Sequence, residues 1–284
     1  MEIKKVGIVG MGTMGTQIGI VSARGGFETV LVDLSDELIK KGLSSMKSFL
    51  MSQVKKGKMG SEEMEKVLSQ IRTTTDLTKA LSDVSLIIEA VFEDIDVKKT
   101  LFRKMDGICP KESIFGSNTS TLSITEMGAV TSRSERCIGT HFLIPAALTP
   151  LVEVVRGLET SDETHQTVIN FLKRCGKETV TVSDSPGFVI NRLYLPMVNE
   201  AFYALESSLA SAEEIDQCCV RGLSFPLGPL AAADAFGLDI LLRCMETFHK
   251  ELGEKYRPSP LLVKLVKAGR LGRKSGRGVY NYTY

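Results

Sequence analysis

Short apolar runs alternate with longer stretches of helical periodicity along the first half of the chain. Residues 6–9 and 28–32 have the pattern of buried strands, and an apolar helical stretch ending near residue 23 separates them. A long helix is predicted over 36–58 and a second over 62–70. Strands that alternate with helices in this way are typical of a parallel sheet with helices on both faces.

The same alternation continues as far as residue 183. Strands are predicted at 71–74, 85–90, 113–116, 136–140, 151–155 and 179–182, and helices at 97–108, from about 123, and at 162–174. The pattern therefore predicts the α/β class, with a Rossmann-type doubly wound sheet in the first half.

The pattern changes at Asp184-Ser185-Pro186-Gly187, a turn-forming group after which strand signals become rare. Helices are predicted beyond it at 188–209, 212–220, 230–236, 238–253 and 260–268. We expect two domains: an α/β domain over residues 1–185, and an all-α domain over residues 186–284. The helix at 188–209 is long and apolar, which favours packing against a second copy of the chain, as a homodimer or a higher homo-oligomer.

Composition narrows the possible partners. The chain has 284 residues, is 43% hydrophobic and carries a net charge of +1, so it has no basic excess to favour nucleic acid. No signal peptide is visible, and the most apolar long window, 224–242, contains two aspartates and two prolines, which argues against a membrane span. Six cysteines without a Cys-x-x-Cys spacing suit reduced thiols in a cytoplasmic protein, and no metal-ligand spacing is visible.

A glycine-rich turn, Gly10-Met11-Gly12-Thr13-Met14-Gly15, joins the first predicted strand to the first predicted helix. In a Gly-x-Gly-x-x-Gly turn, the first glycine permits the tight bend and the second lets a pyrophosphate approach the backbone. The third allows close packing of helix on strand, and the helix N-terminus favours phosphate. The spacing predicts a dinucleotide site; the alternative is an ordinary glycine-rich turn.

Asp33 ends the second predicted strand, eighteen residues after Gly15, near the roughly 20-residue spacing of an acidic residue that binds ribose hydroxyls. A carboxylate at this point repels a 2′-phosphate, and no arginine follows at 34–36. We therefore expect NAD rather than NADP. The alternative is an aspartate that only caps a helix.

The chemistry is expected within residues 139–157, which contain His141, one of three histidines. Glu153 is a lone carboxylate in the apolar run Leu-Val-Glu-Val-Val, where burial is costly without a partner. Two strands joined by the loop at 145–150 could bring it beside the imidazole. There it would stabilise the protonated ring and fix its tautomer, as a general base requires. In the alternative, Glu153 is an edge-strand charge facing water and His141 is a core histidine.

Two polar segments remain open to two interpretations. Ser117-Asn118-Thr119-Ser120 follows a strand, where open parallel sheets bind ligands, but small polar residues there can also cap the next helix. The helix at 36–58 is rich in lysine: Lys40, Lys41, Lys47, Lys55, Lys56 and Lys58. Such a run is usually a solvated face, and the alternative is contact with a polyanion such as the phosphates of coenzyme A.

These motifs, in this order and spacing, resemble the 3-hydroxyacyl-CoA dehydrogenase family, in the group that includes 3-hydroxybutyryl-CoA dehydrogenases. The resemblance covers essentially the whole chain. It rests on the glycine turn, Glu93 with Lys98, Ser117-Asn118-Thr119-Ser120, Thr140-His141-Phe142, Leu151-Val152-Glu153-Val154, Pro186-Gly187-Phe188-Val189-x-Asn191-Arg192, Pro226-Leu227-Gly228-Pro229 with Asp234, Gly237-Leu238-Asp239 and the segment 272–280.

The resemblance implies an oxidoreductase that transfers a hydride between the C3 hydroxyl of a (3S)-3-hydroxyacyl-CoA and NAD, with the 3-oxoacyl-CoA as product. Short-chain substrates such as 3-hydroxybutyryl-CoA are expected. The resemblance also implies that residues 1–185 form the NAD-binding domain and residues 186–284 a helical domain for the substrate cleft and dimerisation. His141 would be the general base and Glu153 its partner, while Ser120 and Asn191 would hydrogen-bond the substrate near where the two domains meet. The positions implied around NAD are Gly10, Gly12, Thr13, Met14, Gly15, Asp33, Glu93, Lys98, Ser120 and Lys274, and those implied near coenzyme A are Lys55 and Lys56.

The sequence departs from the family pattern just after the histidine. The family usually has His-Phe-Phe-Asn-Pro, whose asparagine helps to hold NAD, whereas this chain has His141-Phe142-Leu143-Ile144-Pro145. Thr149-Pro150 replaces a usual Met-Lys. Two alternatives follow: an NAD-dependent dehydrogenase of another 3-hydroxy acid, free or carrier-bound, and an NAD-binding structural or sensor protein without turnover.

Overall fold

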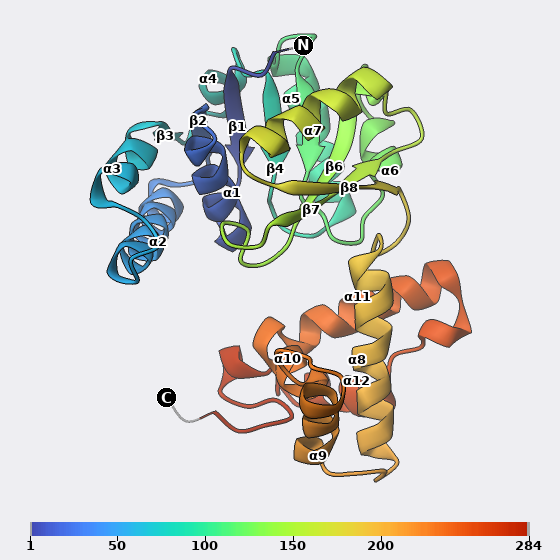
Figure 1. The fold of residues 1–284 in the computed structure, drawn as a ribbon. Helices are drawn as coiled ribbons and strands as arrows, with labels where there is room; N and C mark the ends of the chain where they lie inside the picture. Colours follow the sequence, from blue (N-terminus) through green and yellow to red (C-terminus); the bar gives the residue numbers. More distant parts are fainter. Residues whose placement is uncertain (1, 283–284) are drawn as a thin grey trace. The chain divides into compact units, whose positions relative to one another are not determined.

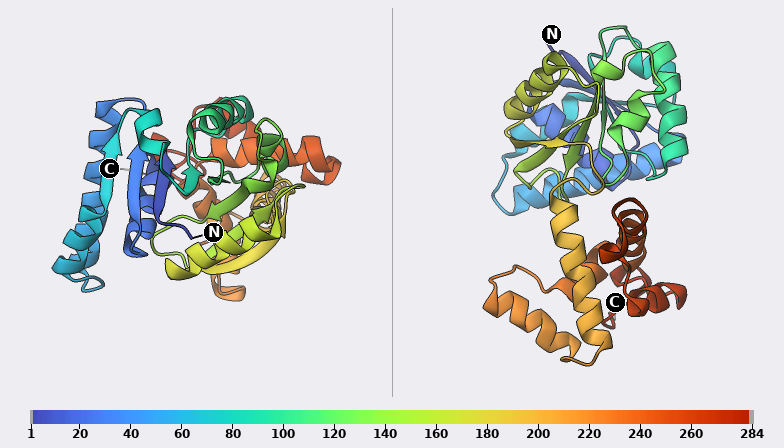
Figure 2. Two further views of the ribbon diagram at one scale, coloured as in Figure 1. Left: turned by 90° about the horizontal axis from the view of Figure 1, so that it is seen from above. Right: turned by 90° about the vertical axis from the view of Figure 1, so that its right-hand side faces the viewer.

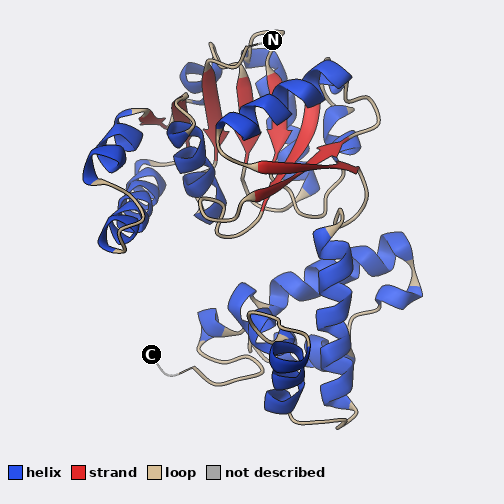
Figure 3. Ribbon diagram, in the orientation of Figure 1, coloured by secondary structure: helices blue, strands red, loops and turns tan. Residues whose placement is uncertain are grey.

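The computed structural model describes residues 2–282 and divides into two compact units, Met1–Asp184 and Ser185–Tyr284. All eight strands that the described residues form lie in the first unit, and the second is built from helices and loops (Figures 1 and 3). The predicted fold class, a Rossmann-type sheet followed by an all-α region, is confirmed.

The first unit is organised around one sheet with strand order β3-β2-β1-β4-β5-β6-β7-β8. Neighbours from β3 to β6 run parallel, β7 is antiparallel to β6, and β8 is parallel to β7. The strands are β1 (Lys5–Val9), β2 (Glu28–Val32), β3 (Ile71–Thr74), β4 (Leu86–Glu89), β5 (Ile114–Ser117), β6 (Cys137–Phe142), β7 (Leu151–Arg156) and β8 (Glu178–Ser183). Strand order reverses between β1 and β4, and parallel sheets bind ligands at the carboxyl ends beside such a point.

Helices cover both faces of this sheet. Helices α1 and α7 lie on one face and α5 and α6 on the other, while α2 and α3 pack outside α1 (Figures 1 and 2). The helices of this unit are α1 (Thr13–Arg24), α2 (Asp36–Lys55), α3 (Ser61–Ser69), α4 (Leu77–Leu81), α5 (Ile95–Ile108), α6 (Ile124–Gly128) and α7 (Asp162–Arg174), with a 3₁₀ turn at Ser134–Arg136.

The core of the first unit lies between the sheet and its helices. Ile8 and Leu31 from central strands are fully buried with Ile18 of α1. Phe27 and Phe171, at a ring-centroid distance of 5.0 Å, join the β2 end of the core to α7. Each fully buried aliphatic or aromatic side chain contributes roughly 1.5–3 kcal/mol to the free energy of unfolding. This apolar framework holds the strand ends in fixed positions.

The second unit packs around α8, and its core includes Phe202, Leu241 and Phe248. Two buried aspartates hold its later segments: Asp216 accepts the backbone N–H of Leu230, and Asp234 accepts that of Val279. Its helices are α8 (Ile190–Glu206), α9 (Ala212–Gln217), α10 (Pro229–Phe236), α11 (Leu238–Leu252) and α12 (Pro260–Lys267), with a π turn at Cys218–Gly222 and 3₁₀ turns at Glu254–Tyr256 and Arg273–Ser275.

The element bounds differ from the predictions where the backbone turns left-handed. Helix α2 ends at Lys55 rather than near residue 58, because Gly57 has a φ of +65°. Helix α8 begins at Ile190 rather than at 188, because Gly187 and Phe188 both have positive φ. The short helix α4 was not predicted at all, since five residues carry too little periodicity.

None of the helices within residues 2–282 combines the length and apolarity needed to cross a membrane. Over the same residues, no group of three or more His, Cys, Asp and Glu side chains could hold a metal ion.

The six cysteines are free, and burial raises the pKa of the Cys109 and Cys137 thiols to about 12. Thiols of that kind are poor nucleophiles at neutral pH.

The glycine turn gives a matched pair of substitutions. A Cβ added at Gly15 would lie 1.8 Å from the carbonyl oxygen of Gly10, whereas one added at Gly12 would meet nothing within 4 Å. We predict that Gly15→Ala lowers the free energy of unfolding by about 3 kcal/mol through overpacking. Gly12→Ala is expected to cost less than about 1 kcal/mol. Denaturant unfolding of both variants checks this, and equal losses would contradict the assigned helix–strand contact.

Asp106 gives a prediction for acid stability. Its carboxylate accepts hydrogen bonds from Ser132 and Arg133. Burial opposes ionisation, but these bonds and the Arg133 charge lower the net pKa of Asp106 from 3.8. A lowered folded-state pKa stabilises the fold above the unfolded pKa, and the stabilisation is lost as pH falls through the folded pKa.

Asp106→Asn should therefore cost about 2 kcal/mol of unfolding free energy at pH 7, as expected for lost hydrogen bonds to a charged group. The difference in unfolding free energy between wild type and variant should become smaller as the pH falls below about 4. Urea unfolding of both proteins from pH 7 to pH 3 measures it. A gap that stays constant over this range would show that the charge of Asp106 contributes nothing.

Candidate active site

The antiparallel pair β6 and β7 brings His141 and Glu153 together. The two residues are directly opposite in the strand register, and the imidazole Nδ1 lies 2.7 Å from Glu153 Oε2. Glu153 is fully buried and His141 is 3% exposed. The prediction that the strands place the carboxylate beside the imidazole is correct in geometry. The alternative, a carboxylate on an edge strand facing water, is wrong.

The loop between β6 and β7 is anchored from two sides. The buried ammonium group of Lys177 donates to the carbonyl oxygens of Ala146 and Thr149, at 2.7 and 2.8 Å. Burial lowers the pKa of Lys177, with a further contribution from the charge of Arg24. On the other side, the backbone N–H of Ala147 donates to Gln17 of α1. These contacts fix the connection that sets the β6–β7 register.

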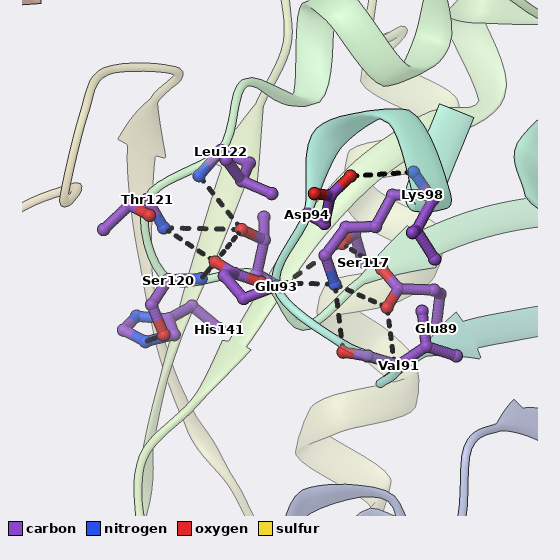
Figure 4. A network of polar contacts seen from close by, with 12 residues as sticks. Glu89, Val91, Glu93, Asp94, Lys98, Ser117, Ser120, Thr121, Leu122 and His141 are labelled. Carbon is purple, nitrogen blue, oxygen red and sulfur yellow. Dashed lines mark hydrogen bonds and ion pairs between the residues drawn. The ribbon is translucent and has the colours of Figure 1, made fainter. Parts of the chain in front are cut away.

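The hydroxyl of Ser120 contacts Nε2, the second nitrogen of the His141 imidazole. Its Oγ is 3.1 Å from His141 Nε2 (Figure 4). Ser120, His141 and Glu153 therefore form one line of polar contacts. Asn118 binds this segment to β6, because its Oδ1 accepts the backbone N–H of Phe142 at 3.0 Å. The loop that follows β5 is thereby held against the carboxyl end of β6.

The structure separates the two interpretations of Ser117-Asn118-Thr119-Ser120. Helix α6 is capped by Ser123, whose hydroxyl accepts the backbone N–H of Glu126. The four earlier residues therefore do not cap this helix. Thr119 instead orders the turn itself, since its Oγ1 accepts the backbone N–H of Leu122 at 3.0 Å.

Glu93 and Lys98, both predicted near NAD, belong to a polar network beside Ser120 (Figure 4). Glu93 Oε1 accepts the backbone N–H of Ser120 at 2.9 Å, and its Oε2 lies 3.2 Å from Lys98 Nζ. Lys98 is 1% exposed and pairs with Glu89. Sequence reasoning missed Glu89, although it is a lone carboxylate in an apolar strand, the same signal that singled out Glu153.

The glycine turn has the features that a dinucleotide phosphate requires. Gly10 has a φ of +102°, and the open space around Gly12 leaves room for a close ligand. Helix α1 has no side-chain cap at its N-terminus, where Thr13 and Met14 form the first turn, so its first N–H groups can bind an anion. A cavity of about 740 Å³ adjoins the turn, lined by Gly10, Gly12 and Asp33 together with the apolar segment 90–92 that follows β4 and residues of α5. Its size suits an organic cofactor.

Asp33 lines this cavity and also stabilises the glycine turn. Its Oδ2 accepts the backbone N–H of Met11 at 2.7 Å, and its Oδ1 accepts that of Leu34 at the same distance. The carboxylate is therefore oriented before any ligand arrives. Its predicted contact with ribose hydroxyls stays a prediction.

The lysines of the α2 region are all solvent-exposed, including the predicted pair Lys55 and Lys56. A second cavity of about 420 Å³ lies between α1 and α2 and is lined by Lys41, Ser45 and Phe49 among others. No acidic residue follows Glu37 within α2, so the later lysines have no acidic neighbour on their own helix. That surface is compatible with a polyanion.

Asn191 and Lys274 lie in the second unit. Asn191 is half-buried in the first turn of α8, and Lys274 pairs with Asp239 at 2.6 Å. Their predicted contacts with substrate and NAD stay predictions. Ile144, which replaces the family asparagine, is 67% exposed in the loop that begins after β6.

Comparisons with known proteins agree with this geometry. Residues 5–185 match the NAD-binding domain of 3-hydroxyacyl-CoA dehydrogenase, and residues 187–282 match its C-terminal domain. The chain is 45% identical over 283 residues to a probable 3-hydroxybutyryl-CoA dehydrogenase of Bacillus subtilis strain 168, covering 99% of this chain and 98% of the relative.

Two solved structures superpose over the whole of both chains. They are the (S)-3-hydroxybutyryl-CoA dehydrogenase of Ralstonia eutropha, with 45% identity and a TM-score of 0.95, and FadB2 of M. tuberculosis, with 38% identity and a TM-score of 0.96. The sequence motifs, the sheet with its glycine turn, and these full-length matches lead to one conclusion: the chain belongs to the 3-hydroxyacyl-CoA dehydrogenase family and is an NAD-dependent enzyme of that family.

Proposed function

We propose that the protein oxidises the C3 hydroxyl of short-chain (3S)-3-hydroxyacyl-CoA thioesters, and reduces the corresponding 3-oxoacyl-CoA, with His141 as the general base. The observation that carries the proposal is the line Glu153–His141–Ser120, with contacts of 2.7 and 3.1 Å. A carboxylate on one imidazole nitrogen leaves the other nitrogen available for proton transfer.

Glu153 determines which nitrogen of His141 can act as the base. A buried carboxylate accepts a hydrogen bond, so Nδ1 carries the proton and Nε2 presents its lone pair on the side of Ser120. Nε2 then takes the proton of the substrate hydroxyl, and in the reverse direction the protonated ring returns it to the ketone oxygen. The negative charge of Glu153 offsets the positive charge that forms in this buried position.

Ser120 and Asn191 are proposed to hold the reacting oxygen of the substrate. Ser120 Oγ already lies at hydrogen-bond distance from the base, so an oxygen bound by Ser120 is also near Nε2. Asn191 offers an amide that can donate to the same class of oxygen. Orientation of this kind lowers the barrier by fixing the reacting atoms before reaction.

NAD, when bound, supplies the acceptor for the hydride that leaves C3. Gly10, Gly12 and Gly15 shape the turn for its pyrophosphate, and the first turn of α1 offers backbone N–H groups at Thr13 and Met14. We propose that Asp33 binds the adenosine ribose and that Glu93, Lys98, Ser120 and Lys274 line the remainder of the cofactor site.

The short-chain substrate is proposed from the relatives. The B. subtilis and R. eutropha proteins, each 45% identical, are both named for 3-hydroxybutyryl-CoA, and the name of the second specifies the S enantiomer. The exposed lysines of the α2 region, with Lys55 and Lys56 near its end, offer charges that suit the phosphates of coenzyme A.

We also propose that the protein is a homodimer or a higher homo-oligomer. The second unit exposes several large apolar side chains, including Leu193, Leu209 and Leu223. Exposed apolar side chains in such number favour association.

Substitution of the base tests the mechanism. His141→Ala should lower kcat for oxidation of 3-hydroxybutyryl-CoA by roughly 10²- to 10⁴-fold, because no other group replaces the proton acceptor. NAD binding, measured by calorimetry, should change little. His165→Gln, at a histidine on α7 that bonds Thr181, is the matched control and should retain wild-type turnover. Near-normal turnover in His141→Ala would disprove the assigned base.

A substrate and cofactor panel, followed at 340 nm, tests the specificity. We expect the highest kcat/KM for the four-carbon thioester, lower values for longer chains, and at least about 10-fold lower activity with free 3-hydroxybutyrate, which lacks the anionic handle. NADP should be on the order of 10²-fold poorer than NAD, because its 2′-phosphate would face the Asp33 carboxylate. Activity with free hydroxy acids and none with thioesters would contradict the proposed substrate.

A further inference from the structure

Glu89 is a fully buried carboxylate at the end of β4 with three hydrogen-bond partners. Its Oε1 lies 2.5 Å from the ammonium group of Lys98 and accepts the backbone N–H of Val91 at 2.7 Å. Its Oε2 accepts the hydroxyl of Ser117 at 2.6 Å. Both oxygens are engaged, so the orientation of the carboxylate is fixed (Figure 4).

Two chains of contacts lead from Glu89 to the turn that carries Ser120. In the first, the Lys98 ammonium group continues to Glu93 Oε2 at 3.2 Å, and Glu93 Oε1 accepts the backbone N–H of Ser120 at 2.9 Å. In the second, Ser117 Oγ accepts the backbone N–H of Thr119 at 3.2 Å. Together they hold the two successive peptide units on either side of the Thr119 Cα atom.

Stability alone is a weak reason to bury this network. Removing Glu89 and Lys98 from water is costly, and well-packed apolar residues of similar volume often stabilise a fold as well as a buried ion pair does. Lys98, at 1% exposure, is also shared by two carboxylates. What this arrangement adds is a defined position for the 119–121 backbone, and hence for the Ser120 hydroxyl 3.1 Å from His141 Nε2.

We propose that Glu89 is a positioning residue for the dehydrogenase reaction. It reaches Ser120 only through Lys98, Glu93 and Ser117, and it fixes the Ser120 hydroxyl relative to the base. The inference rests on the proposed roles of Ser120 and His141. Because small displacements of a positioning group can cost up to about 10²-fold in rate, the effect belongs in kcat.

The test is a double-mutant cycle between Glu89→Gln and Ser120→Ala, with kcat measured at saturating NAD and 3-hydroxybutyryl-CoA. An amide at position 89 places an NH₂ group against either Lys98 or the Ser117 hydroxyl, so one chain of contacts is disturbed. We expect Glu89→Gln to lower kcat roughly 10-fold or more. Once Ser120 is alanine, Glu89→Gln should change kcat less than about twofold further, because the hydroxyl it positions is gone.

Two further variants separate positioning from folding. Asp106→Asn weakens a different ion pair of the same unit, the partly buried contact of Asp106 with Arg133 at 2.7 Å. It should lower the melting temperature and leave kcat unchanged. Ser117→Ala keeps every charge and removes the two contacts of the Ser117 hydroxyl, to Glu89 and to the backbone N–H of Thr119. It should lower kcat a few-fold and also lose its effect in the Ser120→Ala background, so the inference remains testable if Glu89→Gln does not fold.

Losses that multiply in the double variant, or wild-type kcat in Glu89→Gln, would overturn the inference and leave the proposed function intact. Wild-type kcat in Ser120→Ala would remove the proposed role of Ser120, and the inference with it. A kcat loss in Asp106→Asn as large as that in Glu89→Gln would show that both act through general destabilisation, which also overturns the inference.

Discussion

The buried contact between His141 and Glu153 is the constraint on which the site depends. It exists because β7 runs antiparallel to β6 and because the register places the two residues opposite one another. Side chains alternate between the faces of a strand, so a slip of one residue would send Glu153 to the other side of the sheet. Lys177 and Gln17 hold the loop that connects β6 and β7. Both residues are far from His141 in the sequence, so no local pattern predicts that they support its position.

The other functional groups meet this pair because parallel strands end at one edge. The glycine turn follows β1, Glu89 ends β4, and the segment leading to Ser120 follows β5. In the sheet these strands lie in the order β1-β4-β5, with β6 next to β5. The sheet thus places the glycine turn, a charged network and the His141 imidazole at the end where such folds bind ligands. The hydrophobic core below them supplies rigidity rather than chemistry.

Much of this arrangement could be predicted from the sequence, because local signals were strong. Gly10 to Gly15 predicted the turn, and alternating apolar segments predicted the sheet. Glu153 was found because a charge within Leu-Val-Glu-Val-Val needs a partner. Glu89 carries the same signal, but its partners Lys98 and Ser117 come from another helix and strand, and no local pattern connects them. The first residue of α8 was predicted two positions too early for a related reason. Phenylalanine rarely has a positive φ, so its residue type does not predict the left-handed backbone at Phe188. Contacts that depend on tertiary placement were therefore the part beyond sequence reasoning.

The orienting role of Glu153 can be examined without measuring turnover. Nitrogen-15 NMR of histidine-labelled protein distinguishes the two neutral tautomers, and loss of a signal in His141→Ala identifies the ring among the three histidines. At a pH where this ring is neutral, the account predicts a proton on Nδ1, facing Glu153, and an unprotonated Nε2, facing Ser120. A neutral ring protonated on Nε2 would contradict it, because the nitrogen assigned to accept the substrate proton would already carry one.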